Sequence, residues 1–203
     1  MTELEKMISG KIYDCKSDEI GILSAKAHRL CNEYNTLNDD NPRRKQIIEE
    51  LIPNNNGVYL QGPIHFDYGI FTSFGKNCYA NFNLTVLDTS PVTIGDNVFF
   101  GPNVSIVTPI HPLLAEERNL YQREDGVWTD KEYSKPITIK SNCWICSNVT
   151  ICGGVTIGEN SVIGAGSVVI KDIPDGVLAC GNPCRVIRKI TKEDSIYLKK
   201  ELF

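Results

Sequence analysis

Three histidines, His28, His65 and His111, are the side chains of this 203-residue chain best suited to proton transfer near neutral pH. His28 falls in an amphipathic segment, so a surface or cap-interface role is its simpler interpretation. His65 falls in an apolar segment and is expected to pack in an early coil. His111 precedes Pro112 at the point where a regular sequence period stops and a long polar segment begins. It is therefore the candidate general base, with a structural role as the alternative.

Positive side chains gather near the C-terminal end of an otherwise acidic chain, which has 21 Lys and Arg against 25 Asp and Glu and a net charge of −4. The basic side chains of this segment are Lys171, Arg185, Arg188 and Lys189. Arginine suits bidentate phosphate contacts and lysine acts as a point charge, so the segment is either an anion site or a solvated tail. The sequence contains no Walker-type or GxGxxG phosphate loop.

Eight cysteines occur in a chain that shows no export signal, which favours thiols over disulfides. Cys143 and Cys146, with Cys180 and Cys184 downstream, only roughly match the spacing of a zinc ribbon. The simpler expectation is small buried or corner thiols.

The composition excludes several classes of protein. The hydrophobic fraction of 41% and charged fraction of 23% are those of a globular protein. A net negative charge argues against a nucleic-acid binder. The sequence lacks an apolar run of about 20 residues and a signal peptide, so we expect no membrane association and a cytoplasmic location.

A six-residue period organises most of the chain and must position these side chains. An apolar residue occupies every sixth position in two runs: Ile94, Phe100 and Ile106, then Ile139, Ile145, Ile151, Ile157, Ile163 and Val169. Helices repeat near 3.6 residues and strands at 2, so neither explains the pattern. Short strands joined by corners, three to a triangular coil, do explain it. The sequence therefore predicts an all-β solenoid, a parallel β-helix in which residues eighteen apart stack.

The rest of the chain divides around this solenoid. Residues 1–52 carry two amphipathic segments and are predicted to form a helical cap. Residues 53–184 form the β-helix, and a polar stretch at about 112–135 leaves it as a loop, because the period lapses there. Residues 185–203 are a tail, in which a capping-box pattern at Thr191 predicts a short helix.

Several sequence motifs resemble those of the maltose and galactoside O-acetyltransferases, which are hexapeptide-repeat acyltransferases, over nearly the whole chain. They are YANFNL (79–84), VTIGDNV (92–98), TPIHP (108–112), KPITI (135–139), IGAGSV (163–168) and GNPCRVI (181–187). The resemblance implies a left-handed β-helix, an exception to the usual right-handed crossover. It also implies a homotrimer with active sites between subunits, acetyl-CoA as donor and a sugar hydroxyl as acceptor.

The resemblance also implies roles for individual residues. His111 matches the base, and Glu132 matches a glutamate of the maltose type that orients the histidine. Acceptor contacts are implied for Asp14, Asp67 and Asn81, and Asp88 lies beside Thr89, where the galactoside type has an acceptor-contacting Asp. The positions that match the CoA channel are Ser147, Ala165, Ile170, which replaces a Thr, Lys171, Arg185 and Arg188. No metal is required.

Three alternatives stay open. The acceptor is of the maltose or glucose type, or it is a galactoside or another hydroxyl or amine compound. A zinc enzyme with three histidines between subunits is a different class, but His28 lies in the cap and makes such a site hard to assemble. A trimeric sugar-binding scaffold without catalysis is the third.

Overall fold

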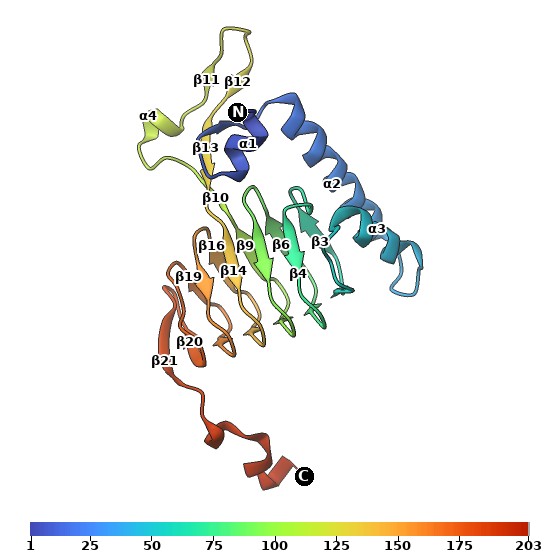
Figure 1. Cartoon of the computed structure of the whole chain (residues 1–203), viewed down its shortest axis with the longest axis vertical. Coiled ribbons are helices and arrows are strands. Elements are labelled where there is room, and N and C mark those ends of the chain that lie inside the picture. The colour runs from blue at the N-terminus through green and yellow to red at the C-terminus, as the bar shows by residue number, and fades with distance from the viewer. Residues whose placement is uncertain (203) are drawn as a thin grey trace.

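The computed structural model describes residues 1–202, and its central feature is a parallel β-helix of about six turns. Helices cover the N-terminal end, and the C-terminal tail extends away from the last coil (Figure 1). The predicted fold class, a β-solenoid with a helical N-terminal cap, is therefore confirmed.

The strands form three faces, numbered 1 to 3, and the chain passes through faces 2, 3 and 1 in turn. Face 1 holds β4 (Thr72–Phe74), β7 (Val92–Ile94), β14 (Ile137–Ile139) and β17 (Thr156–Ile157). Face 2 holds β2 (Tyr59–Leu60), β5 (Tyr79–Ala80), β8 (Phe99–Phe100), β15 (Trp144–Ile145), β18 (Val162–Ile163) and β20 (Val177–Cys180), and ends with the antiparallel β21 (Arg185–Lys189). Face 3 holds β3 (Ile64–Phe66), β6 (Leu84–Leu87), β9 (Ser105–Val107), β16 (Thr150–Cys152) and β19 (Val168–Val169).

The apolar residues of the six-residue period fill the interior. Ile139 pairs in register with Ile94 on one side and Ile157 on the other. All three are almost fully buried, because side chains on short parallel strands stack directly above one another. Cys143 is also buried, as its place in the period predicts, and all eight cysteines are free.

Asparagines line two of the three corners. Between faces 1 and 2, Asn77 donates through its side-chain amide to Asn97 (3.1 Å), Asn97 to Asn142 (3.0 Å) and Asn142 to Asn160 (3.1 Å). Between faces 2 and 3, a second ladder joins Asn83, Asn103 and Asn148. All these asparagines have positive φ, a conformation that asparagine tolerates better than most residues. Each ladder fixes the vertical register of the coils.

The N-terminal cap contains α1 (Glu3–Ile8), β1 (Tyr13–Asp14), α2 (Asp18–Thr36) and α3 (Arg43–Leu51). Apolar side chains of α2 and α3 join the same core as the first coils. Arg44 of α3 is buried where the cap meets the first coil, stacks over Tyr34 and donates to the carbonyl oxygens of Leu60 and Gln61. The cap thereby covers the otherwise open first coil.

The predicted loop is a structured arm at the corner between faces 3 and 1. The chain leaves through β10 (Pro109–Ile110), forms α4 (Ala115–Arg118) and the hairpin β11 (Tyr121–Gln122) and β12 (Trp128–Thr129), and returns through β13 (Lys131–Ser134). β13 lies between β1 and β10 in an antiparallel sheet. The arm thus binds the cap as well as the solenoid (Figure 1).

The C-terminal tail forms three short 3₁₀ turns rather than one α-helix: η1 (Lys192–Asp194), η2 (Ile196–Leu198) and η3 (Lys200–Leu202). The capping box at Thr191 is present, but no residue of these turns is buried. Short helices depend on tertiary packing, and the described residues of these turns are all at least partly exposed. Within residues 1–202, no helix is both long and apolar enough to cross a bilayer.

Candidate functional site

His111 lies at the corner between faces 3 and 1, directly after β10, where the arm begins. Its side chain is 47% exposed, and Nδ1 is 3.5 Å from Oδ2 of Asp130. Nε2 has no hydrogen-bond partner in the described part of the chain, residues 1–202. An imidazole held at Nδ1 by a carboxylate has the tautomer that leaves Nε2 free to accept a proton.

Glu132 does not hold His111, contrary to the sequence-based expectation. Its Oε1 accepts a hydrogen bond of 2.6 Å from the hydroxyl of Tyr13, and burial raises the pKa of this carboxyl. The acid in contact with the imidazole is Asp130. On an extended segment, side chains two residues apart point to the same side. The spacing of Asp130 and Glu132 was therefore the one available signal for Asp130 in the sequence.

Asp67 and His28 face each other beside the cap. His28 Nε2 on α2 lies 3.8 Å from Oδ1 of Asp67 and 3.5 Å from the hydroxyl of Ser24. Burial and the charge of Asp88 raise the pKa of Asp67 to about 6, and the positive charge of His28 partly offsets them. The structure thus places a carboxylate with unused acceptor capacity at this position, which suits a hydroxyl-bearing ligand.

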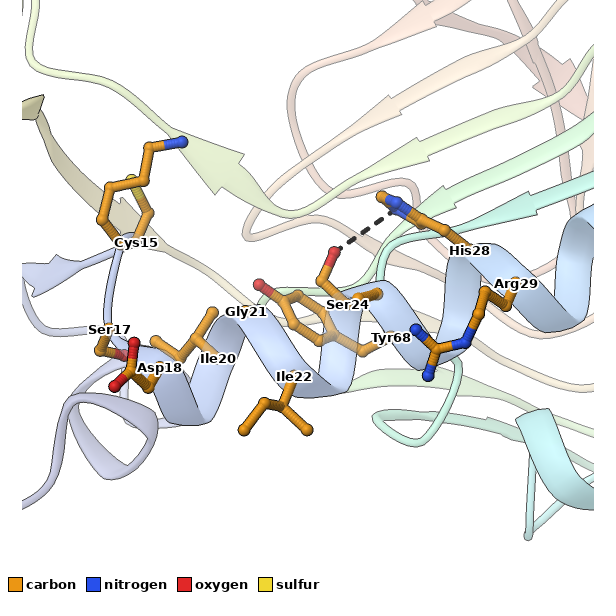
Figure 2. Close-up of a pocket in the computed structure, with 12 residues that line it drawn as sticks. Cys15, Ser17, Asp18, Ile20, Gly21, Ile22, Ser24, His28, Arg29 and Tyr68 are labelled. Carbon is orange, nitrogen blue, oxygen red and sulfur yellow. Dashed lines mark hydrogen bonds between the residues drawn. The ribbon is translucent and has the colours of Figure 1, made fainter.

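Two cavities meet at His28. The larger, of about 750 Å³, runs from Cys15 to His28 between α2 and Tyr68, and Figure 2 shows Cys15 and His28 at its opposite ends. The smaller, of about 260 Å³, contains Asp67 and His65. His65 is exposed on the outer side of β3, so the expectation that it packs in a coil is wrong.

Asp88 does not belong to a binding surface. Its side chain is fully buried, and its oxygens accept hydrogen bonds from the backbone N–H groups of Tyr68 (2.9 Å) and Gly69 (3.2 Å) and from the hydroxyl of Thr72 (2.9 Å). The expected acceptor contact is therefore wrong for Asp88. Its carboxylate instead holds the turn between β3 and β4.

The other predicted residues fall at two different edges of face 3. Asn81, Ser147 and Ala165 lie at the corner between faces 2 and 3, whereas Ile170 and Lys171 lie at the His111 corner. The carbonyl of Ser147 accepts from Gly166 N at 2.9 Å, so the coils that carry Ser147 and Ala165 are stacked. Within one chain, these two groups of residues remain on separate edges.

The basic side chains surround the last coil. Ile170 is 48% exposed and Lys171 is exposed beside it. Arg185 begins β21 and donates to the carbonyl of Cys184. Arg188 already forms a bidentate pair with Asp194, with contacts of 2.6 and 2.7 Å, so an anion would have to compete with that carboxylate.

Metal-ligating side chains are not grouped in the part of the chain that the structure describes. Among residues 1–202, no three His, Cys, Asp or Glu side chains lie together in a way that could hold a metal ion.

Family models match three parts of the chain. Residues 6–54 match the maltose acetyltransferase hexapeptide capping motif, residues 91–111 the hexapeptide repeat of succinyl-transferase, and residues 136–171 six repeats of the bacterial transferase hexapeptide. The galactoside O-acetyltransferase of Escherichia coli K12 is 40% identical over 203 residues, 99% of this chain and 96% of that protein. The chain belongs to the maltose and galactoside O-acetyltransferase family.

Solved structures of this acetyltransferase family have the same architecture. A maltose O-acetyltransferase from Clostridium difficile 630 superposes with a TM-score of 0.85 at 40% identity, over 95% of this chain and 99% of that one. A hexapeptide-repeat acetyltransferase of Vibrio cholerae, solved with acetyl coenzyme A, gives a TM-score of 0.82 at 36% identity, over 95% and 100% of the two chains. The family membership makes this chain an acyltransferase.

Proposed function

We propose that this chain transfers the acetyl group of acetyl-CoA directly to a sugar hydroxyl, with His111 as general base. The observation that carries the proposal is the geometry of His111: Nδ1 faces Asp130, Nε2 has no partner among residues 1–202, and the ring is half exposed at the start of the arm. Direct transfer needs a general base beside the acceptor hydroxyl, because a hydroxyl is a poor nucleophile, whereas the thioester is already activated.

His111 would act twice in one turnover. Nε2 takes the hydroxyl proton while the acceptor oxygen forms its bond to the acetyl carbon. The proton then passes to the sulfur as the carbon–sulfur bond breaks, so that free coenzyme A leaves as a thiol. Asp130 stabilises the imidazolium that exists between the two steps. General-base assistance of this kind contributes roughly 10²–10⁴ in rate.

We further propose that the active form is a homotrimer with each site between two subunits. Asn81, Ser147 and Ala165 lie on a different edge from His111, so a second copy is the simplest way to bring them to the imidazole. Face 2 supports this arrangement with a stripe of outward aromatic side chains in register. The stripe consists of Tyr59, Tyr79, Phe99 and Trp144, all partly or well exposed.

Faces 1 and 2 differ in the side chains they present. On face 1 the positions in register with one another carry Ser73, Thr93, Thr138 and Thr156, whose hydroxyls suit water. Exposing a row of aromatic side chains to water is unfavourable, and covering the row with another surface lowers the free energy. Face 2 is therefore the face that a second copy would cover.

The co-substrate would bind along the last coils. Lys171 and Arg185, both exposed, suit the phosphates of coenzyme A as a point charge and as a planar donor group. Arg188 would contribute only after leaving Asp194. The acceptor would lie near Asp67, whose carboxylate has acceptor capacity to spare.

A thiol-release assay with acetyl-CoA over a panel of acceptors tests the proposal. The panel holds maltose, glucose, a galactoside and an amino sugar. Acetylation of at least one neutral sugar, with thiol release equal to acetyl ester formed, is the expected result. Transfer only to the amine would favour the alternative acceptor class, and sugar binding without thiol release would favour a non-catalytic scaffold.

A further inference from the structure

The antiparallel sheet β1–β13–β10 joins three parts of the chain that are far apart in sequence. In this sheet Tyr13 of the cap lies opposite Glu132 of the returning arm. Asp130 immediately precedes β13, and His111 immediately follows β10. The sheet therefore sets how Asp130 and His111 face each other.

Asp130 is contacted on both of its oxygens. Oδ2 lies 3.5 Å from His111 Nδ1, and Oδ1 accepts a hydrogen bond of 3.1 Å from the thiol of Cys15. Burial and the neighbouring Asp130 raise the pKa of Cys15, so the thiol keeps the proton that it donates. The Asp130 carboxylate, only 20% exposed, is thus held between the cap and the imidazole.

Asp14, the residue before Cys15, is also contacted on both of its oxygens by groups of the same chain. Its Oδ1 accepts hydrogen bonds from the Thr129 hydroxyl (2.7 Å) and the Lys16 N–H (2.9 Å). Its Oδ2 pairs with the guanidinium of Arg123 from the arm. Each oxygen of Asp14 therefore has at least one partner within the chain, and 17% of the side chain is exposed.

We propose that Asp14 and Cys15 are positioning residues that hold Asp130 against Nδ1 of His111. Asp14 fastens the arm through Arg123 and Thr129, and Cys15 fastens Asp130 itself. This role differs from the acceptor contact that family resemblance implies for Asp14. The inference rests on the proposed function, in which His111 is the base.

The location of Asp130 explains why such an anchor is needed. Asp130 belongs to the arm and not to a stacked coil, so neither asparagine ladder fixes its position. Misplacement of a reacting group by about 1 Å can cost roughly 10²-fold in rate. Contacts from the cap replace the missing coil contacts at this point.

The first experiment measures the tautomer of His111. Ring ¹⁵N shifts of histidine-labelled protein, assigned with His111→Gln, are recorded in mildly alkaline solution. The wild type is expected to carry the proton on Nδ1, facing Asp130. Asp130→Ala removes that acceptor, so the proton should move to Nε2, and Cys15→Ala should give a mixture. An unchanged tautomer in Asp130→Ala would overturn the proposal.

The second experiment separates kcat from the acceptor KM. Asp130→Ala is expected to lower kcat by about 10²-fold, and Cys15→Ala and Asp14→Asn by about tenfold, with the acceptor KM nearly unchanged. Cys15→Ser keeps a hydrogen-bond donor toward Asp130 and should restore most of the loss. If Asp14→Asn instead raises the acceptor KM at constant kcat, Asp14 is an acceptor ligand and the proposal is wrong.

Two controls keep the outcomes distinct. Asp40→Asn changes an exposed aspartate between α2 and α3 and should leave kcat and the tautomer unaltered. Thermal melts of every variant verify folding, and Asp130→Asn replaces Asp130→Ala if the latter unfolds. If the wild type acetylates no acceptor, the proposed function fails, whereas the tautomer measurement still decides the positioning role.

Discussion

The corner between faces 1 and 2 and the corner between faces 3 and 1 are built differently, although both turn the same short strands. Asparagine side chains bind one another from coil to coil at the first, with donor–acceptor distances of 3.0–3.1 Å. The positive-φ positions of the second are glycines, such as Gly69 and Gly154, and no amide ladder runs along it within residues 1–202. This corner carries Asp67, His111 and Lys171.

The difference separates two tasks within one repeating fold. The laddered corner between faces 1 and 2 stabilises the stack, and none of the proposed site residues lies on it. The corner without a ladder is free to vary from coil to coil, so it accommodates a buried carboxylate, a base and a long arm. If this separation is right, substitutions at the two corners should affect different measurements.

The largest expected effect belongs to His111. His111→Ala should lower kcat by roughly 10²–10⁴ and leave the free energy of unfolding almost unchanged, because the ring is half exposed and outside the core. Steady-state kinetics and urea denaturation measure the two quantities. A variant that retained most of its turnover would remove His111 from the role of base.

The laddered corner should show the opposite pattern. Asn97→Ala loses two amide hydrogen bonds and strains a residue at φ 54°, so we expect a loss of about 2–4 kcal/mol in unfolding free energy with kcat unchanged. Asn97→Gly keeps the backbone freedom and should cost about half as much. Equal losses in the two variants would show that the hydrogen bonds, not the backbone conformation, dominate.

Asp67 should make stability depend on pH. The folded pKa of Asp67, about 6, lies above the ordinary value of 3.8. Its contribution to folding stability is therefore fully present below pH 3.8 and is lost as the pH rises through 6. Asp67→Asn should therefore become more stable than the wild type between pH 4 and 6, by about 2 kcal/mol, and the difference should approach about 3 kcal/mol at neutral pH. Denaturation of both proteins across this range measures the margin, and a constant difference would contradict the assigned pKa.

The smallest effect should come from the basic side chains. Lys171→Ala combined with Arg188→Ala should raise the KM for acetyl-CoA by up to about fivefold, since exposed ion pairs contribute less than about 1 kcal/mol each. Lys171 should account for most of the increase in KM, because Arg188 is held by Asp194. An unchanged KM would exclude both side chains from the coenzyme A site.

Much of the fold could be predicted because the period is local. Ile139, Ile145 and Ile157 are all completely buried, as the six-residue spacing requires. Asp130 could not be predicted in the same way, because its place depends on pairing between β1 and β13, which lie more than a hundred residues apart in the sequence. Asp88 was mistaken for a binding residue for a similar reason. Its burial depends on contacts with Tyr68, Gly69 and Thr72 of the preceding coil, which the six-residue period does not specify.

The arm has a further consequence for how this architecture diversifies. Asn97 and Asn142 are 45 residues apart and Asn142 and Asn160 are 18 apart, yet their amide hydrogen bonds measure 3.0 and 3.1 Å. The coil therefore closes with the same pitch whether or not 27 additional residues are inserted. A lineage could exchange the whole inserted segment, or lengthen it, and acquire new acceptor preferences while the scaffold stayed the same.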